Sequence, residues 1–171
     1  MLELTDLAPD PCEEWRRSLR FVGWDAAASS AALASVEALL KRGHELVVGV
    51  YDYLSRVPET AEILGWERGI DPAHLEERRR FFTVWLTRTL ALDTSDEFAG
   101  VLFRAGKYHA ADGPRRIHTP EQYVTGSIGL VLSTFAEYLG EARLPAAVVA
   151  RAMSAWSRYL AKEANGARSE K

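Results

Sequence analysis

Apolar residues recur at every third or fourth position along most of this chain, which is the spacing of one face of an α-helix. The pattern predicts two helices within residues 26–54 with a break at Gly43, and Pro58 stops the second of them. Further helices are predicted at 71–92, 95–111, 119–140 and 144–161. The two-residue alternation of β-strands is nearly absent, so we expect an all-α fold of six or seven helices with short connections.

Residues suited to the first turn of a helix mark three of these starts. Asp71 precedes Pro72, the polar segment 93–97 precedes an apolar run, and Thr119 precedes Pro120. A short polar side chain can accept a hydrogen bond from the first free N–H groups, and proline fits the first helical position. After Pro58 we expect a short turn and then a loop at 65–69.

The composition narrows the range of partners. The chain has 171 residues, 47% of them hydrophobic, which fits one domain with one core. Its net charge is −3, so it has no positive field that would attract nucleic acid. No apolar run is long enough to span a bilayer, and the acidic N-terminus lacks a signal-peptide pattern, so we expect no membrane partner and a cytoplasmic location. The single cysteine, Cys12, excludes an internal disulfide and a cysteine-ligated zinc or iron–sulfur site.

One histidine follows the apolar stripe of a predicted helix. Phe98, Leu102, Ala105 and His109 are spaced so that they share one face, and His109 therefore points where the core side chains point. A buried neutral imidazole needs partners for both nitrogens, and an iron atom with a backbone carbonyl would supply them. From periodicity alone, a core histidine bonded to a carbonyl or hydroxyl is the simpler interpretation.

Other polar groups have simpler interpretations too. We expect His44 and His74 to be solvated, and His118 to help cap a helix or, as a remote alternative, to be a second ligand. Glu76-Glu77 beside Arg78-Arg79-Arg80 is typical of a solvated helix face, although the arginines could meet anionic groups such as haem propionates.

Five segments occur in an order and spacing that resemble one family. They are Gly23-Trp24-Asp25; 44–54 followed by 58–64; 81–86; Asp96-Glu97-Phe98 followed by 104–109; and 119–126. They resemble, in that order, the entry to the A helix, the B helix with the turn after it, the E helix, the F helix and the start of the G helix of globin-coupled sensors and protoglobins. The likeness covers roughly residues 23–160, and its weight comes from the order and spacing together.

The resemblance implies a globin fold with an extra N-terminal helix and six to eight helices around a haem. The whole chain, 1–171, would be one domain with a globin core at 22–161, an N-terminal extension at 1–21 and a frayed tail at 162–171. The cofactor implied is haem b, iron protoporphyrin IX.

The resemblance also implies roles for single residues. His109 matches the proximal iron ligand, and Tyr51 matches the distal tyrosine that donates a hydrogen bond to a bound ligand; a core aromatic is an equal alternative for Tyr51. The other expected haem contacts are apolar or aromatic: Phe81, Phe82 and Trp85 on the distal wall, Leu102 on the stripe of His109, and Tyr123 near the proximal side.

The function implied is reversible binding of O2, CO or NO, as a gas sensor or a single-domain globin. The alternatives are a globin-type enzyme, such as a nitric oxide dioxygenase or pseudo-peroxidase served by an external reductase, and a haem-free regulatory sensor globin. The last alternative loses the proximal histidine, so His109 argues against it. The resemblance further implies a homodimer formed through the last two long helices.

Overall fold

The computed structural model describes residues 10–166, except the side chains of 163–166. This part of the chain is all-helical, apart from one isolated β-bridge between Ala110 and His118. Its helices are α1 (Pro11–Phe21), α2 (Ala26–Leu40), α3 (Gly43–Arg56), α4 (Pro58–Leu64), α5 (Pro72–Leu90), α6 (Asp96–His109), α7 (Glu121–Glu141) and α8 (Ala146–Gly166).

Short polar side chains begin α5 and α6, as the sequence predicts, whereas α7 begins at Glu121 without a side-chain cap, so the capping role expected of Thr119 was wrong. Asp71 accepts hydrogen bonds from the N–H groups of Ala73 and His74, and Ser95 accepts one from the N–H of Phe98. Each bond satisfies an N–H group that has no partner within the helix. The starts of α5 and α6, which carry much of the site described below, are therefore determined locally.

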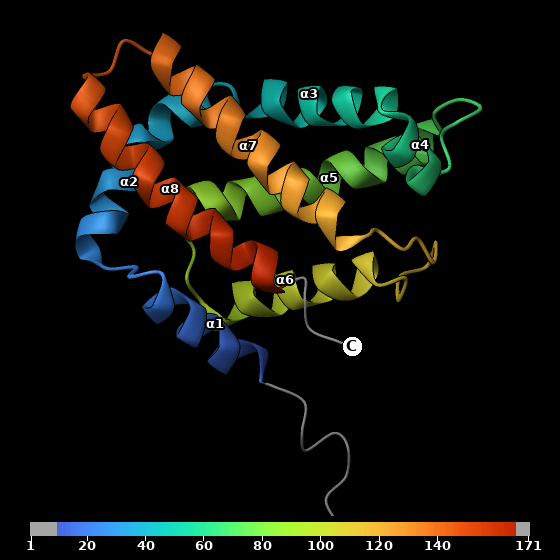
Figure 1. Ribbon diagram of the computed structural model, residues 1–171, viewed down its shortest axis with the longest axis horizontal. Helices are drawn as coiled ribbons and strands as arrows, with labels where there is room; N and C mark the ends of the chain where they lie inside the picture. Colours follow the sequence, from blue (N-terminus) through green and yellow to red (C-terminus); the bar gives the residue numbers. More distant parts are fainter. Residues whose placement is uncertain (1–9, 167–171) are drawn as a thin grey trace, which may run out of the picture.

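Helices α7 and α8 form an antiparallel pair along one side of the molecule, and α8 also packs against α2 (Figure 1). Helix α3 packs against α5, and the short α4 lies at the end of α3 away from α2. Helix α1 lies across the lower end, against α6 and α8. The cavity described below is lined by α3, α4, α5, α6 and α7.

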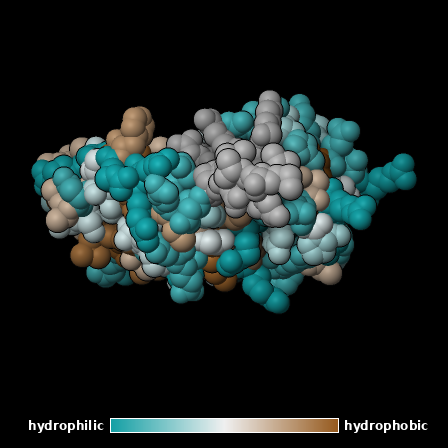
Figure 2. Space-filling model, turned by 90° about the horizontal axis from the view of Figure 1, so that it is seen from below, coloured by the Kyte–Doolittle hydropathy of each residue, from teal (hydrophilic) through white to brown (hydrophobic). Residues whose placement is uncertain are grey.

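The main core lies where α2, α6, α7 and α8 meet. Trp156, Phe135 and Phe98 are almost fully buried there, and apolar burial of this kind is the main stabilising contribution. The indole Nε1 of Trp156 donates a 2.8 Å hydrogen bond to the Oγ of the fully buried Ser35, which links α8 to α2. The face shown in Figure 2 is mostly hydrophilic or neutral, with small separate hydrophobic patches.

The N-terminal helix is anchored by an aromatic contact. Trp15 of α1 lies edge-on to Phe98 of α6 at 5.8 Å and donates a hydrogen bond to the carbonyl of Thr94 at 3.1 Å. The ammonium of Lys162 on α8 lies 3.9 Å from the centre of the Trp15 ring. The extra N-terminal helix implied by the resemblance is therefore part of the packed structure.

The structure differs from the sequence predictions in two places. Residues 58–64 form helix α4, where we expected a turn, because Pro58 begins a new helix as well as ending the old one. Helix α8 continues to Gly166, beyond the predicted end near 161, and the side chain of Lys162 is buried. The rest of the predicted tail, 167–171, and residues 1–9 of the extension lie outside the described residues. Within 10–166, no helix is long and apolar enough to cross a membrane.

Candidate functional site

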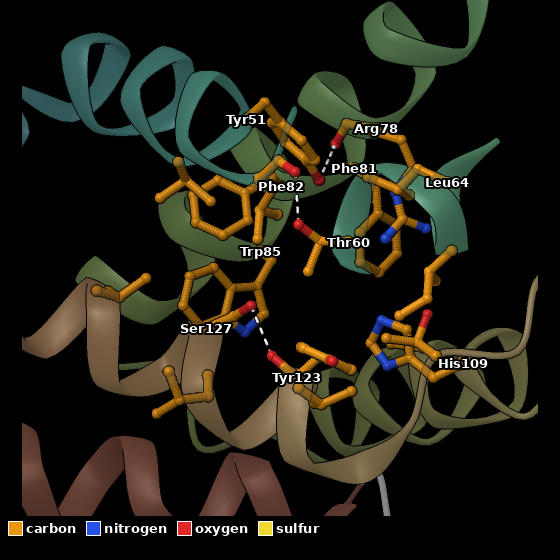
Figure 3. A pocket seen from close by; sticks show the side chains of 18 of the residues that line it. Tyr51, Thr60, Leu64, Arg78, Phe81, Phe82, Trp85, His109, Tyr123 and Ser127 are labelled. Carbon is orange, nitrogen blue, oxygen red and sulfur yellow. Dashed lines mark hydrogen bonds between the residues drawn. The ribbon is translucent and has the colours of Figure 1, made fainter. Parts of the chain in front are cut away.

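A mainly apolar cavity lies between five helices, and all seven side chains that the family resemblance assigned to the haem site line it. Its lining comes from α3 (Val50, Tyr51, Leu54), α4 (Thr60, Ile63, Leu64), α5 (Arg78, Phe81, Phe82, Trp85), α6 (Leu102, Ala105, Gly106, His109) and α7 (Tyr123, Val124, Ser127, Ile128, Val131), together with Thr119. Figure 3 shows most of these side chains converging on the same space.

Helix α5 forms an aromatic wall of this cavity. Arg78, Phe81, Phe82 and Trp85 are spaced by three, one and three residues, which places them on one face of the helix. Phe82 lies 5.0 Å from Trp85 and edge-on to Tyr51 at 6.0 Å, between ring centres. Trp85 is buried, whereas Phe81 is 37% exposed. All three aromatics therefore face the cavity, and Phe81 also reaches its outer edge.

Tyr51 is buried on α3, and its hydroxyl donates a 3.1 Å hydrogen bond to the backbone carbonyl of Arg78. Burial raises the pKa of Tyr51, and the nearby arginines oppose this only in part. The phenol therefore keeps its proton at neutral pH and acts as a hydrogen-bond donor. In Figure 3, Tyr51 lies on the opposite side of the cavity from His109.

His109 is the last residue of α6, and it shares the cavity face of that helix with Leu102, Ala105 and Gly106. Its backbone carbonyl accepts a 2.8 Å hydrogen bond from the N–H of Thr119, which holds the helix end in place. Its Nδ1 is buried and has no hydrogen-bond partner among the described residues. The predicted inward orientation of His109 agrees with this geometry, and the simple alternative of a core histidine bonded to a carbonyl does not account for Nδ1.

Desolvation lowers the pKa of His109 to about 4, and the positive charge of Arg78 acts in the same direction. The imidazole is therefore neutral at pH 7, with a lone pair on one nitrogen. A neutral imidazole is the form that binds a metal ion. The cavity thus combines one potential metal ligand with apolar and aromatic walls.

The polar side chains of the α7 and α4 walls are satisfied by the backbone. The hydroxyl of Ser127 donates to the carbonyl of Tyr123 at 2.7 Å, and the hydroxyl of Thr60 donates to the carbonyl of Leu54. These groups present little unsatisfied polarity to the cavity, which is what an apolar guest requires.

The structure brings together all seven predicted site residues, namely Tyr51, Phe81, Phe82, Trp85, Leu102, His109 and Tyr123. The predicted site residues did not include Arg78 or the three residues of α4. For Arg78 we favoured a solvated helix face, with contact to an anionic group as the alternative. The sequence does contain a signal for Arg78. It lies three residues before Phe81 and four before Phe82, so on a helix it shares their face. The cavity residues of α4 gave no such signal, because a seven-residue helix is too short to show a helical repeat of apolar positions.

The other histidines do not line the cavity. His74, which we expected to be solvated, is instead 3% exposed, and its Nδ1 accepts a 3.2 Å hydrogen bond from Trp66. The expectation was wrong because the loop before α5 folds Trp66 over the first turn of that helix. Among the described residues, no three His, Cys, Asp or Glu side chains cluster as a metal site would require.

Comparison with known protein families identifies a related family. The family model described as Protoglobin matches residues 12–163. A search of the curated proteins found no match.

Proposed function

Because the chain belongs to the Protoglobin family, and is therefore a globin-type haem gas-binding protein, we propose that His109 is the protein ligand of the haem iron and Tyr51 the hydrogen-bond donor on the opposite face. One observation carries this proposal: a neutral, half-buried imidazole whose Nδ1 is buried and has no hydrogen-bond partner among the described residues lies on the wall of an apolar cavity, at the end of a helix.

The residues present suit haem b, iron protoporphyrin IX. A porphyrin is flat and largely apolar, and the rings of Phe81, Phe82 and Trp85 give the cavity a matching aromatic wall. Leu102 and Tyr123 border the cavity from α6 and α7. A haem also needs only one side-chain ligand from the protein, and the cavity offers one in His109.

Bound haem iron supplies reversible binding of O2, CO and NO. The side chains of the cavity would hold the iron, exclude water and donate a hydrogen bond to the ligand. His109 would provide the lone pair that holds the iron, and the apolar residues Val50, Phe82 and Val131 would keep water away. The hydroxyl of Tyr51 would donate a hydrogen bond to a partly negative ligand atom.

We propose gas binding, as a sensor or as a single-domain globin, rather than catalysis. Two alternatives follow from the family resemblance: a nitric oxide dioxygenase or pseudo-peroxidase that uses the same haem, and a haem-free regulator. A haem-free regulator has no need of the inward-facing imidazole of His109, which counts against it. An enzyme would differ from a sensor by turnover: with an external reductant, its gas-loaded form would consume nitric oxide repeatedly.

We also propose that the protein forms a homodimer through α7 and α8. A Cβ placed on Gly126, Gly129 or Gly140 of α7 would meet no atom within 4 Å, so these positions leave room for a close approach by another helix. Gly129→Arg should then convert a dimer to a monomer without disturbing the fold, as measured by light scattering after size-exclusion chromatography. An unchanged mass would place any interface elsewhere.

The proposed function is tested by adding haemin to the purified protein and recording absorption spectra of its ferric, ferrous, O2-treated and CO-treated forms. The expected result is a Soret band that shifts with each gas. His109→Ala should reduce haem retention sharply, whereas Tyr123→Phe, a conservative change in the same cavity, should retain the haem. Equal haem content and equal spectra for His109→Ala and the unmodified protein would refute the proposal.

A further inference from the structure

A positively charged side chain forms part of the cavity wall. Arg78 lies on the cavity face of α5 with Phe81 and Phe82, and its side chain is half-buried. In Figure 3 its guanidinium extends from the Tyr51 side of the cavity towards His109 and passes beside Phe81. The Nε of Arg78 is buried and has no hydrogen-bond partner among the described residues.

Three other arginines, on the same helix or on the loop before α7, have carboxylate partners, although the Nε of one of them, Arg79, is also buried without a hydrogen-bond partner among the described residues. Arg79 lies 3.7 Å from Asp52, the Nε of Arg88 lies 2.7 Å from Asp93, and the Nε of Arg115 lies 3.0 Å from Glu77. No ion pair within the described part of the chain includes Arg78, and no Asp or Glu is among the described residues that line the cavity. A cation in these surroundings gives up hydration without gaining a counter-ion from the cavity wall.

We propose that Arg78 is an anion-binding residue, whose guanidinium binds a carboxylate or a small inorganic anion when the cavity is filled; this inference rests on the proposed function. A guanidinium holds its N–H donors in a planar fork that matches two oxygen atoms of one anionic group. The orphaned Nε provides one such donor at the cavity, and the positive charge favours an anionic guest over a neutral one.

Two sources could supply the anion: the propionate carboxylates of the porphyrin, or an anion that occupies the cavity beside the haem. They can be separated by two measurements on Arg78→Met, which keeps an apolar stem and removes the charge. Arg80→Met is the matched control, because Arg80 lies on the same helix, is exposed and does not line the cavity.

The first measurement titrates the haem-free protein with metal-free protoporphyrin IX and with its dimethyl ester, which lacks the carboxylate charges. If the propionates are the anion, Arg78→Met should weaken protoporphyrin IX binding by about tenfold to a hundredfold, the worth of a charged hydrogen bond. Binding of the dimethyl ester should be unchanged. Because this porphyrin has no iron, the result does not depend on His109 being a ligand.

The second measurement titrates the ferric, haem-loaded protein with sodium fluoride. If the anion occupies the cavity beside the haem, Arg78→Met should raise the fluoride Kd by about tenfold while both porphyrins bind as before. Either result supports the inference and names the source.

Equal behaviour of Arg78→Met and Arg80→Met in both titrations would overturn the inference and leave the proposed function intact. If the unmodified protein bound no porphyrin at all, the proposed function would fail and the inference with it. Should Arg78→Met fold poorly by circular dichroism, Arg78→Lys serves instead, since it keeps the charge but loses the fork, and it should give a smaller loss of the same kind.

Discussion

A single hydroxyl proton determines what Tyr51 can do for a ligand. The phenol donates to the carbonyl of Arg78 at 3.1 Å, and one O–H cannot make two strong hydrogen bonds at once. Donation to a guest in the cavity therefore requires this bond to lengthen or break. The net free energy by which Tyr51 stabilises a bound ligand is therefore the difference between two hydrogen bonds, one to a partly charged ligand atom and one to a neutral carbonyl.

Tyr51→Phe should speed the dissociation of O2 by about tenfold, near the lower end of the range for a charge-assisted hydrogen bond because a competing bond is given up. CO carries less negative charge when bound, so its dissociation should change less. Flash photolysis and stopped-flow measurements on the haem-loaded protein give both rates. Identical O2 dissociation rates in Tyr51→Phe and the unmodified protein would mean that Tyr51 acts only in packing.

For single residues, the sequence predicts which side chains point into the cavity better than it predicts their hydrogen-bond partners. The stripe from Phe98 to His109 shows which way the imidazole points, because helical spacing determines direction. It does not show that the Tyr51 hydroxyl meets the Arg78 carbonyl, since that contact joins residues 27 apart in sequence and depends on how α3 packs on α5. Arg78 was misassigned for a related reason: charge suggested solvent, whereas its position on the helix indicated the cavity.

At the scale of elements, a buried polar contact links two helices at the centre of the main core. The hydroxyl of Ser35 donates to the carbonyl of Ala32 and accepts from the indole of Trp156, and both Ser35 and Trp156 are fully buried. This contact joins α2 to α8 at the centre of the core, so its loss should affect global stability rather than the cavity itself.

Ser35→Ala should lower the free energy of unfolding by about 1–3 kcal/mol, because the indole N–H of Trp156 loses its acceptor in a place that water does not reach. Urea titration followed by circular dichroism measures this. Ser30→Ala, an exposed change on the same helix, should be neutral or stabilising by up to about 0.5 kcal/mol. A Ser35→Ala protein as stable as Ser30→Ala would show that the contact contributes little.

Helix positions are the part of the fold that the sequence predicts well. Asp71 and Ser95 have the predicted capping roles, and the break expected at Gly43 lies between α2 and α3. Helix α4 was missed because Pro58 is compatible with both the end of one helix and the start of the next. Whether a seven-residue helix forms there depends on burial of Ala61 and Leu64 against Tyr51 and Trp66, which is tertiary information.

For the whole molecule, the buried imidazole of His74 makes stability depend on pH. His74 is 3% exposed and accepts a hydrogen bond from Trp66, so it is held in its neutral form. Desolvation lowers the pKa of His74 first. Around it, two arginines lower the pKa further and two carboxylates oppose them: Arg115, Arg78, Glu77 and Asp71. The unfolded chain, with a pKa near 6.5, takes up a proton more readily than the folded one.

The contribution of His74 to stability is therefore fully present above about pH 6.5 and is lost as the pH falls towards the folded-state pKa. We expect the free energy of unfolding of the haem-free protein to decrease over this range, and His74→Gln to flatten the decrease. Urea titrations at a series of pH values test this, with His44→Gln, an exposed change on α3, as the control. A His74→Gln profile parallel to the unmodified one would contradict the account.

The arrangement of the whole molecule was predicted through the family resemblance rather than from helical spacing. Periodicity gives helices but not their partners; Trp15 meets Thr94 and Phe98 across some eighty residues, and the resemblance alone implied an extra N-terminal helix. The order of the segments identified the family, and the match over residues 12–163 confirms it. The residue roles inside the cavity remain predictions.

The central claim is that the imidazole of His109 binds the haem iron, and the iron–histidine stretching band in the resonance Raman spectrum of the ferrous protein reports that bond. The account predicts this band in the unmodified protein, its loss in His109→Gly, and its return when free imidazole is added to fill the space left by the side chain. A band of unchanged position and intensity in His109→Gly without imidazole would contradict the claim.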